Sequence, residues 1–389
     1  MKRECAYKYR FYPTNEQEDL LKQTFGCCRF VYNRMLEFST DNWHAQQRTS
    51  FAATCKELTR AKATPELSWL KDVSSVALQQ SLRHLDMAFK RFFKKQAEYP
   101  SFKKKTGKQS ASFTQAAFRF DPGTRRLWLA KTSAPLKIKW SRKLPFVPIT
   151  VTVSKDSAGR YFVSFQGKMD IQPLPKKEQV VGIDMGLKHF AVTSDGEFIE
   201  NPKHLKKHQV RLKMLQQRLA RRTKGGKNWN KTKHQIAKLH AKIADSRKDF
   251  LHKFTTRMIK QYGHIITEDL AVRNMVKNHC LAGAINDAAW SEAFRQFTYK
   301  SEWYERIYTQ IDRFFPSSKR CHVCGHILEH LDLSTRFWTC SRCGTHHNRD
   351  ENASLNIKAV GLTVQVFGLG VRLPKGFALL EASPCGETT

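Results

Sequence analysis

Four cysteines near the C-terminal end of the chain are the feature that most constrains its fold. Cys321, Cys324, Cys340 and Cys343 follow the spacing C-x2-C-x15-C-x2-C. Two such pairs can each form a chelating turn and bring four thiolates to one tetrahedral centre, for which zinc is the usual ion. Because all four ligands are cysteine, no coordination position is left for water. We therefore expect one structural zinc ion in a small module over residues 317–346.

The remaining cysteines do not indicate a disulfide framework. They are scattered through a chain of 389 residues that begins without a signal-peptide pattern, so we expect reduced thiols and a cytoplasmic location. No run of 18 apolar residues is present, and we expect no membrane-spanning segment. Four histidines near the metal module are expected on the surface rather than among the ligands: His322, His326, His346 and His347.

The charge balance of the chain indicates a polyanionic partner. The sequence has 68 Lys and Arg against 34 Asp and Glu, a net charge of +34, and it is 40% hydrophobic, as expected of a globular protein. Nucleic acid is the first candidate. An anionic membrane surface is the second, but no basic amphipathic segment with an anchoring face stands out.

The first half of the sequence predicts a strand, then helices, then short strands. Residues 6–11 alternate in polarity, and Thr14 with Gln17 has the spacing of a capping box that begins a helix. Helical patterning continues to about Phe93. Two alternating runs, 149–153 and 161–165, predict a hairpin. Residues 173–177 are predicted to be a linker.

The second half predicts a different set of elements. They are, in order, a strand at 180–183, a hairpin of 190–193 with 197–199, a helical pair over 203–248 broken at Gly225-Gly226, a strand at 265–266 that ends at Glu268, helix over 284–308, a strand over 309–315 and, after the cysteine module, a helix over 350–360.

Three acidic residues lie at the ends of predicted strands or at the start of a predicted helix. Asp184 and Glu268 each follow an apolar strand, and Asp350 opens the last helix. Carboxylates in a polycationic chain suit the binding of divalent metal ions against a phosphodiester, and two ions about 4 Å apart need several carboxylates to bridge and flank them. The layout is that of an RNase H-like nuclease centre.

Each acid has a simpler explanation when it is taken alone. Asp350 could be a helix N-cap, and Glu268 could pair with a lysine. Asp269 should point to the opposite face of the strand from Glu268, and we treat it as a bystander. Asp195 is expected to be only a turn residue. The joint pattern favours the nuclease centre.

Two basic regions are candidate nucleic-acid contacts. The helical pair over 203–248 has 16 basic residues and one acid, which favours phosphate binding over a merely solvated face. Its candidate contacts are Arg218, Arg221, Arg222 and Lys224. A loop near residue 100 adds Tyr99, Phe102, Lys103, Lys104 and Lys105. The two aromatic residues could stack on bases or belong to the core.

The motifs together resemble the TnpB proteins, the insertion-sequence-encoded ancestors of type V CRISPR effectors, over nearly the whole chain. The matching segments are YKYRFYPTNEQ with Gly26, Arg29 and Asn33, then YPSFKKK, GIDMGLKHFAVTSDG, IITEDLAV, SSKRCHVCGH with WTCSRCG, and NRDENASLNI. Family members often have Asp where this chain has Asn348, just before Arg349-Asp350. We expect only a tuning effect, because the family's catalytic acid corresponds to Asp350.

The resemblance implies an α+β multidomain fold and assigns roles to the sites. The RuvC triad would be Asp184, Glu268 and Asp350, and the zinc-ribbon ligands would be the four cysteines named above. The implied domains are 1–13, the first wedge or barrel strand; 14–110, a helical recognition domain; 111–172, the wedge β-barrel; 173–316, the RuvC nuclease domain with the basic pair; 317–346, the zinc ribbon; 347–362, the final RuvC segment; and 363–389, a C-terminal tail.

The implied function is that of an RNA-guided DNA endonuclease. It would use two catalytic Mg²⁺ ions, one structural Zn²⁺ ion and a guide RNA from the transposon end, and would act beside a short target-adjacent motif in bacterial or archaeal cytoplasm, associated with the nucleoid. Its partners would be double-stranded and displaced single-stranded target DNA, with no membrane, and it would be monomeric with RNA. The rival functions are a nuclease-inactive RNA-guided repressor, an unguided transposase or DNA-binding accessory protein, and a zinc-containing RNA-binding protein without chemistry.

Overall fold

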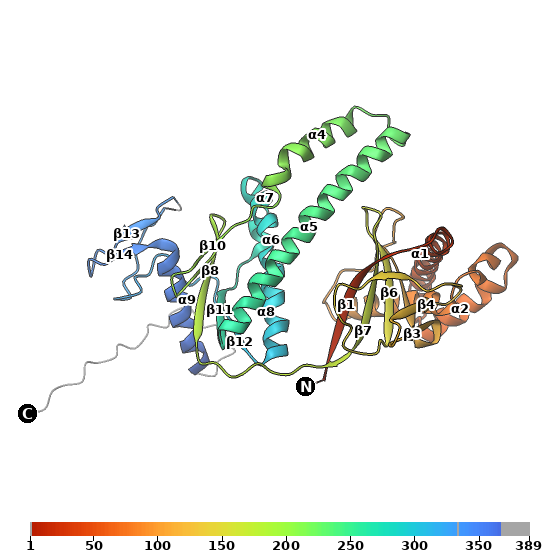
Figure 1. The fold of residues 1–389 in the computed structure, drawn as a ribbon, viewed down its shortest axis with the longest axis horizontal. Coiled ribbons are helices and arrows are strands. Elements are labelled where there is room, and N and C mark those ends of the chain that lie inside the picture. Colours follow the sequence, from red (N-terminus) through yellow and green to blue (C-terminus); the bar gives the residue numbers. More distant parts are fainter. Residues whose placement is uncertain (1, 333, 367–389) are drawn as a thin grey trace, which may run out of the picture. The chain divides into compact units, whose positions relative to one another are not determined.

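The computed structural model describes residues 2–332 and 334–366. The chain divides into two compact units, Met1–Ile171 with Arg218–Lys238 and Gln172–Gln217 with Leu239–Thr389. Each unit has its own five-stranded sheet (Figure 1).

The sheet of the first unit is antiparallel, with the strand order β2-β6-β7-β1-β5, and β3 and β4 form a separate ribbon. The strands are β1 (Lys2–Tyr12), β2 (Gln109–Thr114), β3 (Phe118–Asp121), β4 (Arg126–Leu129), β5 (Lys137–Lys139), β6 (Thr150–Lys155) and β7 (Tyr161–Asp170). The predicted hairpin is confirmed as β6 and β7. Tyr9 and Phe11 on β1 are buried, because alternate side chains of this strand face the core.

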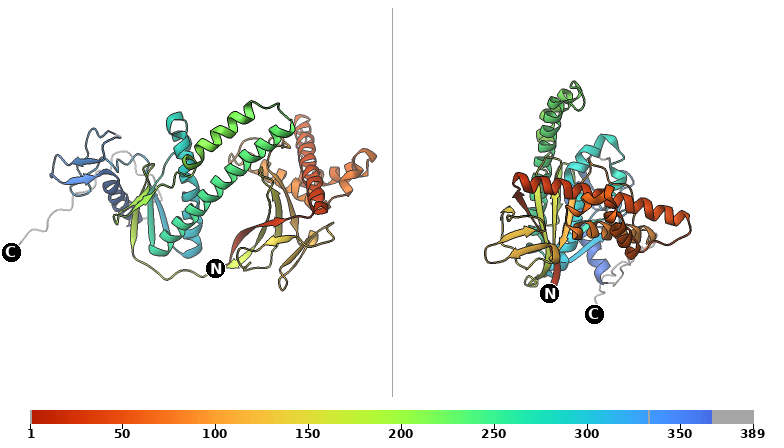
Figure 2. Two further views of the ribbon diagram at one scale, coloured as in Figure 1. Left: turned by 45° about the horizontal axis from the view of Figure 1, so that its top comes forward. Right: turned by 90° about the vertical axis from the view of Figure 1, so that its right-hand side faces the viewer.

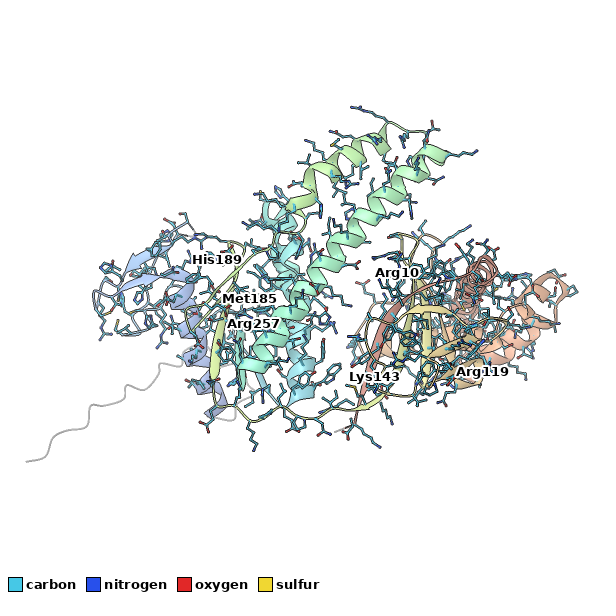
Figure 3. The ribbon with its side chains drawn as sticks, viewed as in Figure 1. Arg10, Arg119, Lys143, Met185, His189 and Arg257 are labelled. Carbon is cyan, nitrogen blue, oxygen red and sulfur yellow. The ribbon has the colours of Figure 1, made fainter. Side chains whose placement is uncertain are left out.

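The first helix of the first unit begins where the sequence predicted. The helices of this unit are α1 (Asn15–His44), α2 (Phe51–Ala63) and α3 (Ser75–Phe93), with the 3-10 turns η1 (Pro65–Lys71) and η2 (Gln115–Ala117). The capping box is confirmed, since Thr14 accepts from the Gln17 backbone while the Gln17 side chain accepts from the Thr14 backbone. Figure 3 labels Arg10 and Arg119 in this unit, whose guanidinium groups lie over the rings of Tyr12 and Trp128 at 5.1 and 4.3 Å.

The sheet of the second unit has the order β10-β9-β8-β11-β12. Its strands are β8 (Val180–Met185), β9 (His189–Thr193), β10 (Phe198–Glu200), β11 (His264–Glu268) and β12 (Ile307–Ile311). β8, β11 and β12 are parallel, and β9 and β10 are antiparallel. The predicted strand at 309–315 is wrong in its bounds, because pairing of Ile307 with His264 starts β12 earlier. The helix predicted over 284–308 ends at Tyr304, where Glu305 takes a left-handed backbone conformation.

The helices of the second part of the chain are η3 (Lys206–His208), α4 (Gln209–Ala220), α5 (Lys227–Gln261), α6 (Val272–Met275), α7 (His279–Ala288), α8 (Trp290–Tyr304) and α9 (Arg349–Val366). Among these helices, α5 and α8 pack on one face of this sheet and α9 on the other. The predicted helical pair is confirmed as α4 and α5, although α5 continues beyond residue 248. No helix among residues 2–332 and 334–366 is long and apolar enough to span a membrane.

Two glycines let α9 approach the sheet closely, on the face opposite α5 and α8 (Figure 2). A Cβ atom on Gly182 of β8 would lie 2.2 Å from the backbone oxygen of Ser354, and one on Gly361 would lie 2.4 Å from the side chain of Ile266 on β11. Ile266 packs with Ile357 of α9 on this face. The middle of α9 is therefore fixed against the central strands.

The predicted linker at 173–177 has no regular structure, but its polar backbone is held by a buried arginine. The Arg306 guanidinium donates to the carbonyl oxygens of Pro175 at 2.8 Å, Ile259 at 3.1 Å and Leu174 at 3.5 Å. Buried backbone carbonyls need such partners. The segment from Leu174 onward thus belongs to the packed body of the second unit.

Candidate functional site

Two of the predicted acids lie side by side on neighbouring strands. β8 and β11 are parallel, with Ile183 opposite Thr267, so the next residues of this register are Asp184 and Glu268. Val181 and Ile183 pack on the side of α5 and α8, which by alternation puts Asp184 on the face covered by α9. Both side chains are half-buried.

The third acid reaches the same face from the first turn of α9. The Asn348 side chain caps this helix, accepting from the backbone N–H groups of Asp350 at 3.0 Å and Glu351 at 3.3 Å. The simpler explanation that Asp350 is the cap is therefore wrong, and its carboxylate is free for another role. Arg336 donates to Asp350 at 3.2 Å.

The three acids influence one another electrostatically. Burial raises the pKa of Asp184 well above its ordinary value, and the negative charges of Glu268 and Asp350 raise it further, against the opposing effect of Arg349 and Arg336. Burial also raises the pKa of Glu268, while a hydrogen bond from Ser317 lowers it. Repulsion among buried carboxylates is relieved by a cation, and an all-oxygen donor set suits Mg²⁺ or another hard divalent ion.

The three carboxylates do not converge on a single point. In the described part of the chain, the four cysteines are the only group of at least three candidate ligand atoms that all lie within 4.8 Å of one another. The acids therefore stand further apart than this. The three acids therefore share one face of the sheet without forming a compact group of ligand atoms.

The cysteine residues meet as their spacing predicted. Sγ of Cys321 lies 3.7 Å from Sγ of Cys343, and Sγ of Cys324 lies 3.6 Å from Sγ of Cys340. With Zn–S bonds of about 2.3 Å, the sulfurs of a tetrahedral site lie about 3.8 Å apart. The four thiols therefore have the separation that a zinc ion needs, and no other donor is required.

Each cysteine pair forms the same turn, which ends in a glycine with positive φ. Gly325 and Gly344 have φ of 75° and 69° and donate to the carbonyls of Cys321 and Cys340. Strands β13 (Phe337–Thr339) and β14 (His346–Asn348) form the adjoining hairpin. The prediction that His347 lies on the surface is wrong: it is buried, with Nε2 3.1 Å from Sγ of Cys321, because it packs under Trp338.

Two neighbours of the acids were missed from the sequence. Ser317 donates from Oγ to Glu268 at 2.5 Å, so Glu268 pairs with a hydroxyl rather than with a lysine. Arg336, which contacts Asp350, belongs to the segment between the two cysteine pairs. Neither residue stands in a recognisable spacing relative to the acid that it contacts, so only the fold reveals them.

Asp269 and Asp195, which the sequence pattern did not assign to the acid centre, interact with other residues. Asp269 forms an ion pair with Arg313. Asp195 lies in the β9–β10 turn, as expected, but is more than a turn residue: it accepts a hydrogen bond from Tyr262 at 2.9 Å and lies 3.8 Å from Lys358 of α9. These contacts tie the turn to α9 and to the residue that follows α5.

The basic loop of the first unit is fastened to α1. Asn33 accepts from the Lys103 backbone N–H at 2.8 Å and donates to its carbonyl at 3.0 Å, while the Lys103 ammonium lies 3.6 Å from the centre of the Tyr32 ring. Lys104 and Lys105 are exposed. The loop thus presents its positive charges from a fixed backbone.

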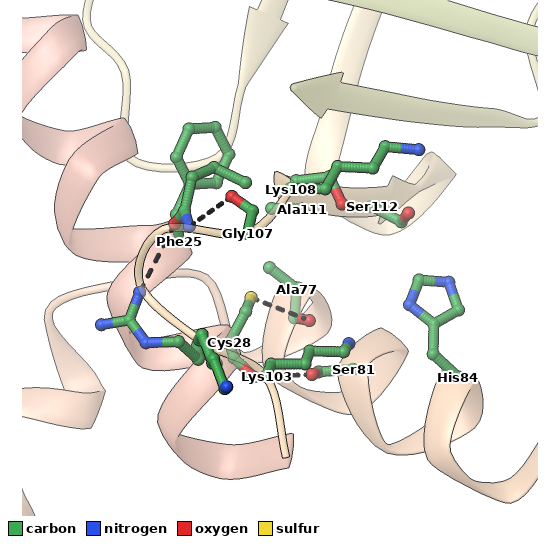
Figure 4. A pocket seen from close by; sticks show the side chains of 14 residues that line it. Phe25, Cys28, Ala77, Ser81, His84, Lys103, Gly107, Lys108, Ala111 and Ser112 are labelled. Atoms are coloured by element: carbon green, nitrogen blue, oxygen red, sulfur yellow. Dashed lines mark hydrogen bonds between the residues drawn. The ribbon is translucent and has the colours of Figure 1, made fainter. Parts of the chain in front are cut away.

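This loop borders a basic pocket of about 300 Å³ between α1, α3 and β2. Its cationic lining consists of Arg29, Lys103, Lys104 and Lys108, His84 lies beside them, and no lining residue is acidic. Figure 4 labels His84, Lys103 and Lys108 around it. Burial and the nearby Lys103 lower the pKa of His84. The pocket therefore suits an anion such as a backbone phosphate.

The remaining predicted contacts fall into two groups. Tyr99 packs edge-on against Phe92 at 5.3 Å between ring centres and shares a hydrogen bond with Thr40, so it is partly built into the helical layer. Phe102 is 58% exposed. Arg222 donates to Asn228 and Thr232, which fixes the turn between α4 and α5. Arg218, Arg221 and Lys224 are exposed.

Comparison with known families matches three parts of the chain. Residues 148–279 match a model described as "Probable transposase", residues 1–48 one described as a helix-turn-helix domain, and residues 290–357 one described as a Cas12f1-like TNB domain. The second description does not fit the structure, in which residues 1–48 form β1 and the single long helix α1.

Several curated relatives match over nearly the full length. A Streptomyces pristinaespiralis protein, named as an RNA-guided DNA endonuclease, is 47% identical over 94% of this chain and 92% of its own. The Escherichia coli K12 protein InsQ, named in the same way, is 34% identical over 95% of each. The TnpB-like protein L770 of Acanthamoeba polyphaga mimivirus is 23% identical over 91% of this chain and 73% of its own.

A solved structure shows the same fold. The Cas12f1 chain of a complex with guide RNA and target DNA superposes with a TM-score of 0.59 at 13% identity, covering 92% of this chain and 99% of that one. The relatives that are 47% and 34% identical over nearly the whole chain show that it belongs to the TnpB family, with which the fold agrees.

Proposed function

We propose that this protein is an RNA-guided DNA endonuclease that cuts double-stranded DNA beside a short target-adjacent motif. The support comes from relatives of that name that are aligned over nearly the whole chain. The chemical part is supported by Asp184 and Glu268 on neighbouring strands, with Asp350 at the start of the helix that covers the same face of the sheet. In this proposal the unit is an RNase H-like RuvC nuclease domain.

The three acids would hold two Mg²⁺ ions, which would supply a metal-bound hydroxide and neutralise charge on the phosphate. Glu268 would offer the carboxylate oxygen that Ser317 does not occupy. Asp350 would exchange its contact with Arg336 for a metal ion, leaving the guanidinium near the phosphate. Cys321, Cys324, Cys340 and Cys343 would hold one structural Zn²⁺.

The nucleic-acid partners would be a guide RNA from the transposon end and a target DNA duplex with its displaced strand. Base pairing would supply the target sequence, and the basic surface would bind the backbones. We assign the helical region at 14–110 to target recognition and the barrel at 111–172 to a wedge domain. We also expect one protein chain for each RNA.

The proposal is tested by purifying the protein after co-expression with its flanking transposon end. We expect a bound RNA that can be sequenced, and Mg²⁺-dependent cutting of DNA that matches it. The alanine variants of Asp184, Glu268 and Asp350 should each lose cutting while keeping the RNA. Asp269→Asn is the matched control, since this neighbouring acid pairs with Arg313. Cutting that persists in the three alanine variants would refute the site.

The basic pocket offers a separate test of DNA binding. Lys104→Ala should weaken target binding several-fold and lower the slope of log affinity against log salt by about one phosphate contact. Lys22→Ala is the matched control, because Lys22 is already paired with Glu18 and Asp19. Equal effects of the two substitutions would show that only overall charge matters.

An unguided transposase is the second candidate, favoured by the description of the model that matches residues 148–279. It would use the same acids to join DNA ends without RNA. RNA-free protein that performs target-independent strand transfer would support this function over guided cutting. A nuclease-inactive repressor would be expected to lack at least one of the acids, and all three are present.

A further inference from the structure

We propose that Ser317 is a positioning residue for Glu268, and that the cysteine module and α9 together hold Ser317 in place. This inference rests on the proposed function, in which Glu268 is a metal ligand. It adds a residue at the base of the cysteine module to the working parts of the acid centre.

Ser317 is placed to fix the orientation of the Glu268 carboxylate. The serine is buried, and its Oγ donates to Oε1 of Glu268 at 2.5 Å. A carboxylate with one oxygen held in this way has a fixed plane, and its second oxygen is directed to a single position. Hydrogen-bonding partners of metal ligands commonly set ligand orientation and metal affinity in this manner.

Two asparagines of α9 hold the Ser317 segment from behind. Asn356 donates from Nδ2 to the carbonyls of Ser317 at 2.9 Å and Arg320 at 2.6 Å. Asn352 donates to the same carbonyls, at 3.4 and 2.8 Å, and its Oδ1 accepts from the His322 backbone N–H at 3.0 Å. Both asparagine side chains are buried, so these bonds are not exchanged with water.

The same short segment therefore serves both centres. Residues 317–322 contain Ser317 at one end and the zinc ligand Cys321 near the other, and α9 contributes both the asparagines and Asp350. A shift of the segment would move the Glu268 partner, while α9 keeps Asp350 in register with it. The orientation of Glu268 thus depends on a folded cysteine module.

The test compares Ser317→Ala, Ser317→Thr and wild type, each loaded with guide RNA. Loss of the hydroxyl should raise the Mg²⁺ concentration for half-maximal cutting by roughly 10–100-fold, with the rate largely restored at saturating Mg²⁺. Ser317→Thr keeps the hydroxyl and should stay close to wild type. Binding of Mn²⁺, followed by electron paramagnetic resonance against a Glu268→Ala baseline for ions held by RNA, should weaken in Ser317→Ala by a similar factor.

Ser354→Ala is the matched control, since this buried serine of α9 donates only to the Glu351 carbonyl. It should leave the Mg²⁺ dependence unchanged. Wild-type Mg²⁺ dependence in Ser317→Ala would overturn the inference, as would a loss of cutting that high Mg²⁺ does not restore and that is accompanied by loss of zinc. If Glu268→Ala itself still cuts, the proposed function fails; if it is inactive while Ser317→Ala is normal, only the inference fails.

Discussion

The acid centre and the cysteine centre differ in how the chain brings their side chains together. Each groups side chains that are negatively charged when deprotonated, and each lies in the second unit. The cysteine centre uses two turns of nearly identical geometry within one short stretch of chain. The acid centre takes its members from two strands and a helix that are far apart in the sequence. One centre is built locally, and the other exists only once the sheet has formed.

This difference predicts different weaknesses. A local site fails when a ligand is lost, because its own metal supplies the folding energy. A site assembled across a sheet also fails when the packing between its elements is disturbed. The close approach of α9 to Gly182 is such a packing contact, and it involves no ligand at all.

The largest expected effect is the loss of chemistry at the acid centre. Asp184→Ala should lower the rate of DNA cutting about 10³-fold or more, since it removes a metal ligand and transition-state stabilisation together. Zinc content and guide-RNA binding should remain at wild-type levels, as measured by atomic absorption and gel shift. Loss of zinc in this variant would show that the cysteine centre depends on an intact acid centre.

Loss of one ligand at the cysteine centre should act through folding. Cys321→Ser should reduce bound zinc to near zero and lower the melting temperature, because zinc binding supplies folding free energy to such modules. Cutting should fall with it, since α9 and residues 317–322 share hydrogen bonds. Cys280→Ser, at an exposed thiol on α7, should change neither property. If zinc-free protein cuts DNA normally, the acid centre does not depend on the cysteine centre.

A packing change should harm the acid centre without touching any ligand. In Gly182→Ala the new methyl group would lie 2.2 Å from the Ser354 oxygen and 2.5 Å from the Lys358 nitrogen, so α9 must move. We expect a loss of about 1–3 kcal/mol in the free energy of unfolding, measured by urea titration, and slower cutting. Gly283→Ala, which meets nothing within 4 Å on α7, should instead stabilise the protein slightly.

The smallest expected effect is on the free energy of unfolding of the protein without bound metal ions. Burial and the other two acids raise the pKa of Asp184, so the folded state binds this proton more tightly than the unfolded chain does. Between the ordinary pKa of 3.8 and the raised value, the free energy of unfolding therefore falls as pH rises.

Asp184→Asn should remove this contribution. In EDTA at neutral pH its melting temperature should exceed that of wild type, and the difference should shrink as pH is lowered towards 4 and when Mg²⁺ is added. Calorimetry at several pH values measures this. A variant less stable than wild type in EDTA would mean that the carboxylate contributes favourable contacts even without metal. Such a gain in stability would accompany the loss of cutting, as expected for a strained functional site.

The residues that the sequence could predict are those whose positions depend on local structure. The spacing of Cys321 and the other three cysteines is sufficient to predict that they cluster, because each turn is formed by neighbouring residues. Asp184 and Glu268 could be predicted to be neighbours because each follows a run of apolar residues on a strand, and alternation then selects the face. Ser317 and Arg336 could not, because their contacts depend on how the cysteine module packs on α9. The end of α8 was misplaced for a similar reason, since the apolar pattern continues from the helix directly into β12.

The fastening of the interdomain segment by Arg306 defines where the chain can be divided. From Leu174 onward the backbone is hydrogen-bonded into the second unit, whereas the last residues of β7 pair within the first. The stretch 171–173 is thus the natural seam for limited proteolysis or for a split protein expressed as two pieces. A break placed only a few residues later would separate the Leu174 and Pro175 carbonyls from the second unit, leave the buried Arg306 guanidinium without two hydrogen-bond acceptors and destabilise that unit.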